Sequence, residues 1–122
     1  MRCLLILFAT LLATPLAAQD WALRPSDEPL TPDQMAERLV GRSLTFYDDG
    51  ISRFSPGGSY SYTYSAANGG SSQFGTFTLG ADGTVCIAYR NGLSRCDLYV
   101  ADGARLVVLT EDGGRYPVRP EG

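Results

Sequence analysis

Residues 72–100 read SQFGTFTLGADGTVCIAYRNGLSRCDLYV, and this stretch decides the fold. Polar and apolar residues alternate along three segments, 72–79, 84–90 and 93–100, which are separated by an Asp-Gly and an Asn-Gly pair. Alternation with a period of two is typical of half-buried strands, and these pairs are typical of tight hairpin turns. The stretch therefore predicts three consecutive antiparallel strands.

The two cysteines of this stretch select the register of the second hairpin. A two-residue turn would place Cys86 and Cys96 on opposite faces of the sheet, where no disulfide can form. A three-residue loop over 90–92 instead pairs Tyr89 with Leu93 and sets the cysteines directly opposite each other. Because a pair of cysteines in an oxidising compartment is usually bonded, and the N-terminus discussed below indicates export to such a compartment, we expect a Cys86–Cys96 disulfide across this hairpin.

The same pattern extends over most of the chain. Asp-Gly, Asn-Gly and Gly-Gly turn signals recur about every ten residues, which indicates short strands joined in sequence. The additional predicted strands are 43–48, 51–55, 59–66, 105–110 and 115–118. A mainly β, eight-stranded antiparallel meander tends to curl on itself, because closure removes its edges. We expect an up-and-down barrel or a strongly curled sheet, with a two-sheet sandwich as the alternative.

One short helix is predicted before the strands. Thr31 is a good N-cap, Pro32 suits the first helical position, and Gln34 completes a capping box. Gly41 provides the stop signal. The helix should span 32–40 and dock on the sheet, since so short a helix is marginal alone.

The N-terminus is typical of a secretory signal. Arg2 precedes an apolar run, and small residues lead to a cleavage site after Ala18. The run is too short to span a bilayer, so we expect no membrane span after cleavage, with a retained anchor as the alternative. This divides the chain into a signal (1–18), an extended arm (19–30) and one β-barrel-like domain (31–122). The protein is predicted to be periplasmic or secreted.

The composition excludes several functions. The formal net charge is −3, and the chain contains neither Lys nor His. Without a basic stripe we expect no nucleic-acid partner, and without His no Ser-His-Asp triad. The Asp-Gly pairs lack the spacing of calcium loops, so turn chemistry explains them and we expect neither a metal nor a cofactor.

Aromatic residues supply the candidate ligand-binding site. One predicted strand carries a tyrosine at every second position, Tyr60, Tyr62 and Tyr64, so the three rings share a face of the sheet. They either fill the core with their hydroxyls at its rim, or they form a stacking platform for a sugar or aromatic ligand. Trp21 in the arm either packs onto the domain or marks a second contact. Core filling and packing are the favoured interpretations. An eight-stranded barrel is barely wide enough for its own side chains, so we expect contacts at a rim or outer face.

Three acids are candidates for carboxylate chemistry. Glu37, Asp97 and Glu111 would have to converge in one pocket to act as a hydrolase pair. Asp97 beside Arg95, and Glu111 near Arg115, are interpreted as ordinary surface ion pairs.

Three segments resemble short exported bacterial proteins of unknown function. They are Gly41–Asp48, the run Gly75-Thr76-Phe77 followed by 82–86, and Cys96-Asp97-Leu98-Tyr99, and the similarity covers residues 31–118. The resemblance implies a β-rich exported fold and brings no activity. A looser likeness to barrel-type periplasmic inhibitors and lipocalin-like binders rests on architecture alone.

These observations favour a non-enzymatic periplasmic binding or accessory domain whose partner is a protein or a small ligand. The alternatives are a structural subunit of an envelope assembly and a small hydrolase that acts through carboxylates or tyrosines.

Overall fold

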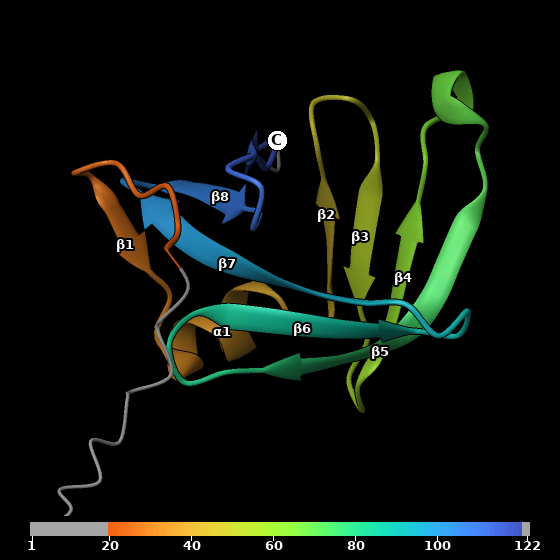
Figure 1. The fold of residues 1–122 in the computed structure, drawn as a ribbon, viewed down its shortest axis with the longest axis horizontal. Coiled ribbons are helices and arrows are strands. Elements are labelled where there is room, and N and C mark those ends of the chain that lie inside the picture. Colours follow the sequence, from red (N-terminus) through yellow and green to blue (C-terminus); the bar gives the residue numbers. More distant parts are fainter. Residues whose placement is uncertain (1–19, 121–122) are drawn as a thin grey trace, which may run out of the picture.

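The computed structural model describes residues 20–120, so the predicted signal over 1–18 lies outside the described part. Within the described residues, nine strands and one α-helix follow one another, and Figure 1 shows their arrangement. Their bounds are β1 Asp27–Pro29, α1 Pro32–Arg38, β2 Arg42–Thr45, β3 Ile51–Phe54, β4 Ser59–Thr63, β5 Ser72–Leu79, β6 Thr84–Tyr89, β7 Ser94–Asp102, β8 Arg105–Leu109 and β9 Arg115–Pro117. A 3₁₀ turn, η1 Ala66–Asn68, follows β4 and ends the strand predicted over 59–66.

The predicted meander is confirmed. Strands β2 to β9 pair antiparallel in sequence order, and the sheet forms a curled half-barrel. In Figure 1, β2, β3 and β4 stand upright while β6 lies nearly horizontal, which shows how strongly the sheet curls. Just beyond the ends of the outer strands β2 and β9, one isolated antiparallel bridge joins Phe46 and Val118.

The predicted disulfide and its register are also confirmed. Cys86 and Cys96 are bonded and lie directly opposite each other in the β6–β7 ladder. The Tyr89 N–H donates to the Leu93 carbonyl at 2.8 Å, and Gly92 takes a positive φ of 88° inside the three-residue loop. A left-handed glycine at this position is what such a hairpin requires.

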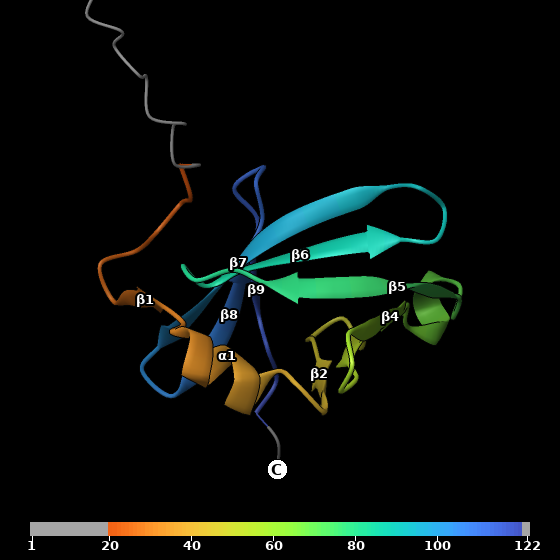
Figure 2. The ribbon, with the colours of Figure 1, turned by 90° about the horizontal axis from the view of Figure 1, so that it is seen from below.

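The helix begins as its capping residues predict. The Gln34 N–H donates to Thr31 Oγ1 at 3.2 Å, and the Thr31 N–H donates to Gln34 Oε1 at 3.0 Å. Met35 and the C-cap Leu39 are fully buried. Figure 2 shows α1 in the space enclosed by the curled sheet, next to β8, so the helix fills one end of the half-barrel.

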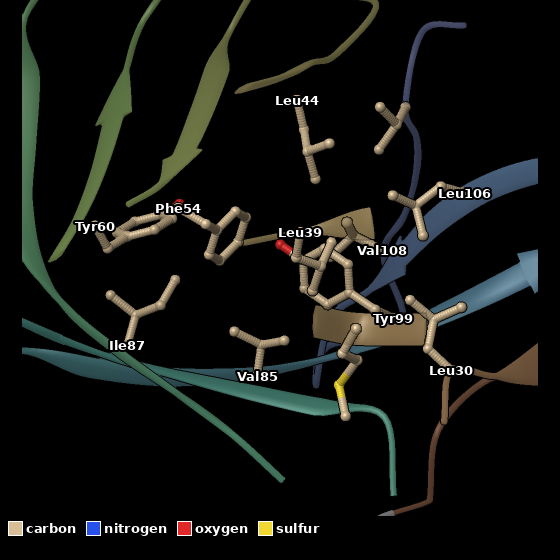
Figure 3. Packing of buried hydrophobic residues seen from close by; sticks show 12 residues of the cluster. Leu30, Leu39, Leu44, Phe54, Tyr60, Val85, Ile87, Tyr99, Leu106 and Val108 are labelled. Carbon is tan, nitrogen blue, oxygen red and sulfur yellow. The ribbon is translucent and has the colours of Figure 1, made fainter. Parts of the chain in front are cut away.

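The main core lies on the concave face. Phe54 occupies its centre, between Tyr60 and Tyr99 (Figure 3). Its ring centroid lies 5.1 Å from those of Tyr60 and Phe77 and 6.0 Å from that of Tyr99. Edge-on and tilted contacts of this kind are the favoured arrangement of aromatic rings. Aliphatic side chains from the strands and the helix surround these rings: Leu30, Met35, Leu39, Leu44, Val85, Ile87, Leu106, Val108 and Val118.

A second, smaller cluster lies on the convex face and involves the predicted arm. Leu98, Val100, Val107 and Leu109 of β7 and β8 form it, and Trp21 packs against it. The arm contains a strand that the sequence pattern did not indicate. This strand, β1, pairs with the C-terminal half of β7. The arm therefore covers apolar surface that the meander would otherwise expose.

One ion pair anchors this arm and corrects a prediction. Arg115 does not pair with Glu111 but donates two hydrogen bonds to Asp27, at 2.7 and 2.8 Å, and a third to Asp102 at 3.4 Å. The Asp27 side chain is fully buried, and the hydrogen bonds from Arg115 are the largest cause that lowers the pKa of this carboxyl to about 2. The predicted surface pair is instead a buried link between β1 and β9.

Candidate functional site

The tyrosines of β4 run from the core to the opening of the half-barrel. Tyr60 is 5% exposed, Tyr62 is partly buried against the core, and Tyr64 is 41% exposed. Their alternation places them on the concave side, as predicted. The core-filling interpretation therefore holds for Tyr60, whereas Tyr64 lines the opening and its role as a stacking surface stays a prediction.

Tyrosines from three other strands join them. Tyr89 of β6, Tyr99 of β7 and Tyr116 of β9 line the same cavity as Tyr60, Tyr62 and Tyr64, so six of the seven tyrosines of the chain converge there. The alternation of β6 already placed Tyr89 with the apolar Val85 and Ile87, but no local signal connects Tyr116 to a strand more than fifty residues earlier.

A glycine allows two of these rings to meet. Gly75 is the cross-strand neighbour of both Tyr60 and Tyr89, and their ring centroids lie 6.1 Å apart at 70°. A Cβ atom on Gly75 would lie 2.2 Å from the Ala88 carbonyl oxygen, so only glycine fits this close approach of β5 to β6.

The cavity contradicts the expectation of a filled interior. It holds about 710 Å³ and opens between the β2–β3 turn, the β6–β7 hairpin and the β8–β9 turn. The expectation assumed a closed eight-stranded barrel, whereas the sheet forms a half-barrel that leaves this end open. The cavity is half open and lies on the concave face at this end of the half-barrel.

The pair Arg95–Asp97 lies in this cavity and is not an ordinary surface pair. Arg95 donates from Nε and Nη2 to the two carboxylate oxygens of Asp97, at 3.0 and 2.8 Å. The Asp97 side chain is 8% exposed and the Arg95 side chain 49% exposed. Burial raises the pKa of the Asp97 carboxyl, and the hydrogen bonds from Arg95 oppose that rise. The correct disulfide register implies this placement, because cysteines on the convex face put Arg95 and Asp97 on the concave one.

The buried tyrosines are neutral hydrogen-bonding groups. Tyr60 Oη lies 2.9 Å from Ser52 Oγ, and burial raises the pKa of Tyr60 well above its ordinary value in spite of this bond. Burial likewise raises the pKa of Tyr99. Neither phenol ionises near neutral pH, so neither supplies a phenolate base or nucleophile.

Two carboxylates stand at the edge of the opening. Asp48 Oδ1 accepts the Gly50 N–H at 2.9 Å, and Asp112 accepts the Thr110 hydroxyl and the Gly114 N–H. Both residues line the cavity. Gly50 makes room for a ring, because a Cβ atom there would lie 2.1 Å from Tyr62 Oη.

The remaining sequence candidates lie elsewhere. Trp21 packs on the convex face, so it is not brought together with the tyrosines. Of the acids Glu37, Asp97 and Glu111, only Asp97 lines the tyrosine cavity. Within residues 20–120 no three His, Cys, Asp or Glu side chains form a group suited to hold a metal ion.

No helix in the described part of the chain is both long and apolar enough to cross a membrane. Comparison with models of protein families, with curated proteins and with solved structures gives no match for this chain.

Proposed function

We propose that this chain is an exported, non-enzymatic binding domain that holds a small ligand in the tyrosine cavity. The predicted signal over 1–18 and the Cys86–Cys96 disulfide support a periplasmic or secreted location, since disulfides persist in oxidising compartments. The observation that carries the proposal is the convergence of six tyrosines around the Arg95–Asp97 pair.

The cavity has the dimensions and lining of a ligand site. Its volume of about 710 Å³ falls within the usual range for small-molecule pockets, which combine aromatic walls with a few fixed polar groups. Arg95 and Asp97 are fixed by their paired hydrogen bonds, and the buried rings are held by the core. A site held in place before binding loses little conformational freedom when the ligand arrives.

The lining favours a ligand with a flat ring and polar edges. Tyr62 and Tyr64 meet at 82° with centroids 5.0 Å apart, so their rings form two walls of a corner. Gln73, Asn91 and Ser94 add hydrogen-bonding groups around it. A sugar or a small aromatic compound matches both features, because its ring stacks on a tyrosine while its edge bonds to polar groups.

The chemistry of these groups argues for binding rather than turnover. The buried phenols stay protonated, and both oxygens of Asp97 are already engaged by Arg95. General acid or base catalysis requires a group free to exchange a proton with the substrate. The rival proposal, a carboxylate-dependent hydrolase, rests on Asp97 because burial raises its pKa.

The test is an NMR titration of the ¹⁵N-labelled mature protein with methyl glucoside and, separately, with indole. We expect amide shifts that concentrate at the residues lining the cavity. Tyr64→Ser and Tyr116→Ser remove exposed rings and should abolish those shifts without unfolding the domain. The matched control is Tyr47→Ser, which removes the exposed tyrosine that lies outside the cavity.

Unaltered spectra with both probes would overturn the proposal. Shifts that persist in Tyr64→Ser and Tyr116→Ser, or that vanish equally in Tyr47→Ser, would also overturn it. Chemical conversion of the probe during the titration, lost in Asp97→Asn, would favour the hydrolase.

A further inference from the structure

A second cavity lies at the other end of the half-barrel, where arginines from three elements and from the chain after β9 meet. It holds about 510 Å³ between the end of α1, the start of β2, the β7–β8 turn and the chain after β9. The arginines are Arg38, Arg42, Arg105 and Arg119. The tyrosine cavity begins at Phe46, just after β2, and at Val108 of β8, and it shares no lining residue with this cavity, so the two sites are separate.

The charge at this cavity is opposite to that of the whole chain. The formal net charge of the chain is negative, yet these arginines surround a cavity to which Glu37 contributes the single carboxylate among its described lining residues. Arg119 is bound to Asp49 at 2.5 Å. Within residues 20–120, Arg38, Arg42 and Arg105 have no carboxylate within ion-pair distance. Among the described lining residues, three guanidinium groups without a carboxylate partner and one carboxylate leave a local excess of two positive charges.

Backbone carbonyls hold two of these arginines at the cavity. Arg38 Nη2 donates to the Ala104 carbonyl and Arg42 Nε donates to the Glu37 carbonyl, each at 3.3 Å. A guanidinium carries five N–H donors, so each keeps several donors for a ligand. Planar donor pairs of this kind bind phosphate and carboxylate oxygens in a bidentate manner.

The floor of the cavity is apolar. Leu44, Leu106 and Val118 line it and belong to the main core. We propose that this cavity binds a small organic phosphate monoester, with the phosphate between Arg38, Arg42 and Arg105 and the organic group on this floor. A phosphate monoester carries close to two negative charges at neutral pH, which matches the local excess of positive charge.

The test is isothermal titration calorimetry of the mature protein with n-butyl phosphate at low ionic strength. We expect saturable binding that weakens with added salt, weaker binding of inorganic phosphate and none of n-butanol. Arg42→Gln and Arg105→Gln should each weaken butyl phosphate binding about tenfold, because each removes charge-assisted hydrogen bonds. Both side chains are exposed, so the fold should be retained, and an unchanged circular dichroism spectrum verifies this.

The matched control is Arg53→Gln. Arg53 also lacks a carboxylate partner within the described residues, but it lies on β3 outside the cavity and bonds to Thr63. Its loss should change the affinity by less than about twofold. An equal effect of Arg53→Gln would overturn the proposal, as would absence of binding or equal affinity for butyl phosphate and inorganic phosphate. Binding to vesicles with and without phosphatidic acid distinguishes a lipid headgroup from a soluble ester as the ligand. Binding of the vesicles or of butyl phosphate supports the site if Arg42→Gln weakens it.

Discussion

Single residues set the shape of the concave face, and Gly75 does so by allowing two strands to approach closely. Its lack of a side chain lets β5 approach the backbone of β6 and leaves room above it for the rings of Tyr60 and Tyr89. A glycine in a strand interior normally weakens the strand. Here the lost propensity is offset by an aromatic contact across the glycine, which stabilises the wall of the tyrosine cavity.

Gly75→Ala is therefore expected to destabilise the domain by about 1–3 kcal/mol, because the new Cβ meets a backbone carbonyl that cannot rotate away. Urea denaturation followed by circular dichroism measures the loss. The control is Thr76→Ala, whose exposed side chain points to the convex face and should cost about 0.5 kcal/mol or less. Equal losses in the two variants would show that the close approach has no energetic role.

Among the elements, β1 depends most on contacts that lie far away in the sequence. Its three residues pair with β7, and a side chain of β9 holds it in place through Asp27 and Arg115. A strand this short has little stability of its own. The buried ion pair and the packing of Trp21 on the convex cluster therefore keep the arm on the domain.

The anchor makes stability depend on pH in the acid range. The pKa of Asp27 falls from 3.8 to about 2 on folding, so its carboxylate stabilises the fold above the unfolded value, and this contribution is lost as the pH drops through the folded value. Asp27→Asn should lower the free energy of unfolding by roughly 2 kcal/mol at neutral pH. The difference in the free energy of unfolding between Asp27→Asn and wild type should shrink as the pH falls from 4 to 2.

Guanidinium denaturation across this pH range measures the effect. Glu28→Gln is the control, because it removes one negative charge from the neighbouring exposed residue without touching Arg115. If the difference in the free energy of unfolding between wild type and Asp27→Asn stayed constant from neutral pH to pH 2, the role of the Asp27 carboxylate as the anchor of the arm would be contradicted.

At the scale of the whole molecule, the half-barrel carries two cavities of opposite character. The tyrosine cavity opens where the β2–β3, β6–β7 and β8–β9 connections meet, and the arginine cavity lies at the end occupied by α1. The buried centre around Phe54 separates them. The outer strands β2 and β9 do not pair along their length, and an isolated bridge between Phe46 and Val118 joins the segments just beyond them.

Export of the whole molecule can be checked by one mass measurement. We expect the protein recovered from the periplasm or medium of an expressing bacterium to begin at Gln19. Its mass should be two hydrogen atoms below that of the reduced chain, because Cys86 and Cys96 are bonded. Treatment with a reductant restores those two hydrogens and serves as the control. A product that retains Met1 in the membrane fraction, or that carries two free thiols, would contradict the prediction.

Local chemistry made much of the fold predictable. The capping residues Thr31 and Gln34 act on donors within one helical turn, so the start of α1 follows from neighbouring residues. The β6–β7 hairpin is equally local, since loop length, Gly92 and the two cysteines all constrain one register. The face shared by Tyr60 and Tyr62 follows from strand periodicity alone.

The site required information that no local pattern contains. Nothing near Arg115 indicates Asp27 as its partner, and nothing near Tyr116 indicates Tyr62 as a neighbour in one cavity. The expectation of a filled interior was wrong because strand count does not reveal whether a sheet seals or stays open.

The amino-acid sequence alone was therefore sufficient for the order of β2 to β9, the helix start and the disulfide, because each depends on residues close together in the chain. Folding in three dimensions was needed to place Arg95 and Asp97 beside the tyrosines and to gather Arg38, Arg42 and Arg105 around one cavity. The reason is physical: the curl of the sheet determines which distant segments meet, and that curl results from the packing of the whole core.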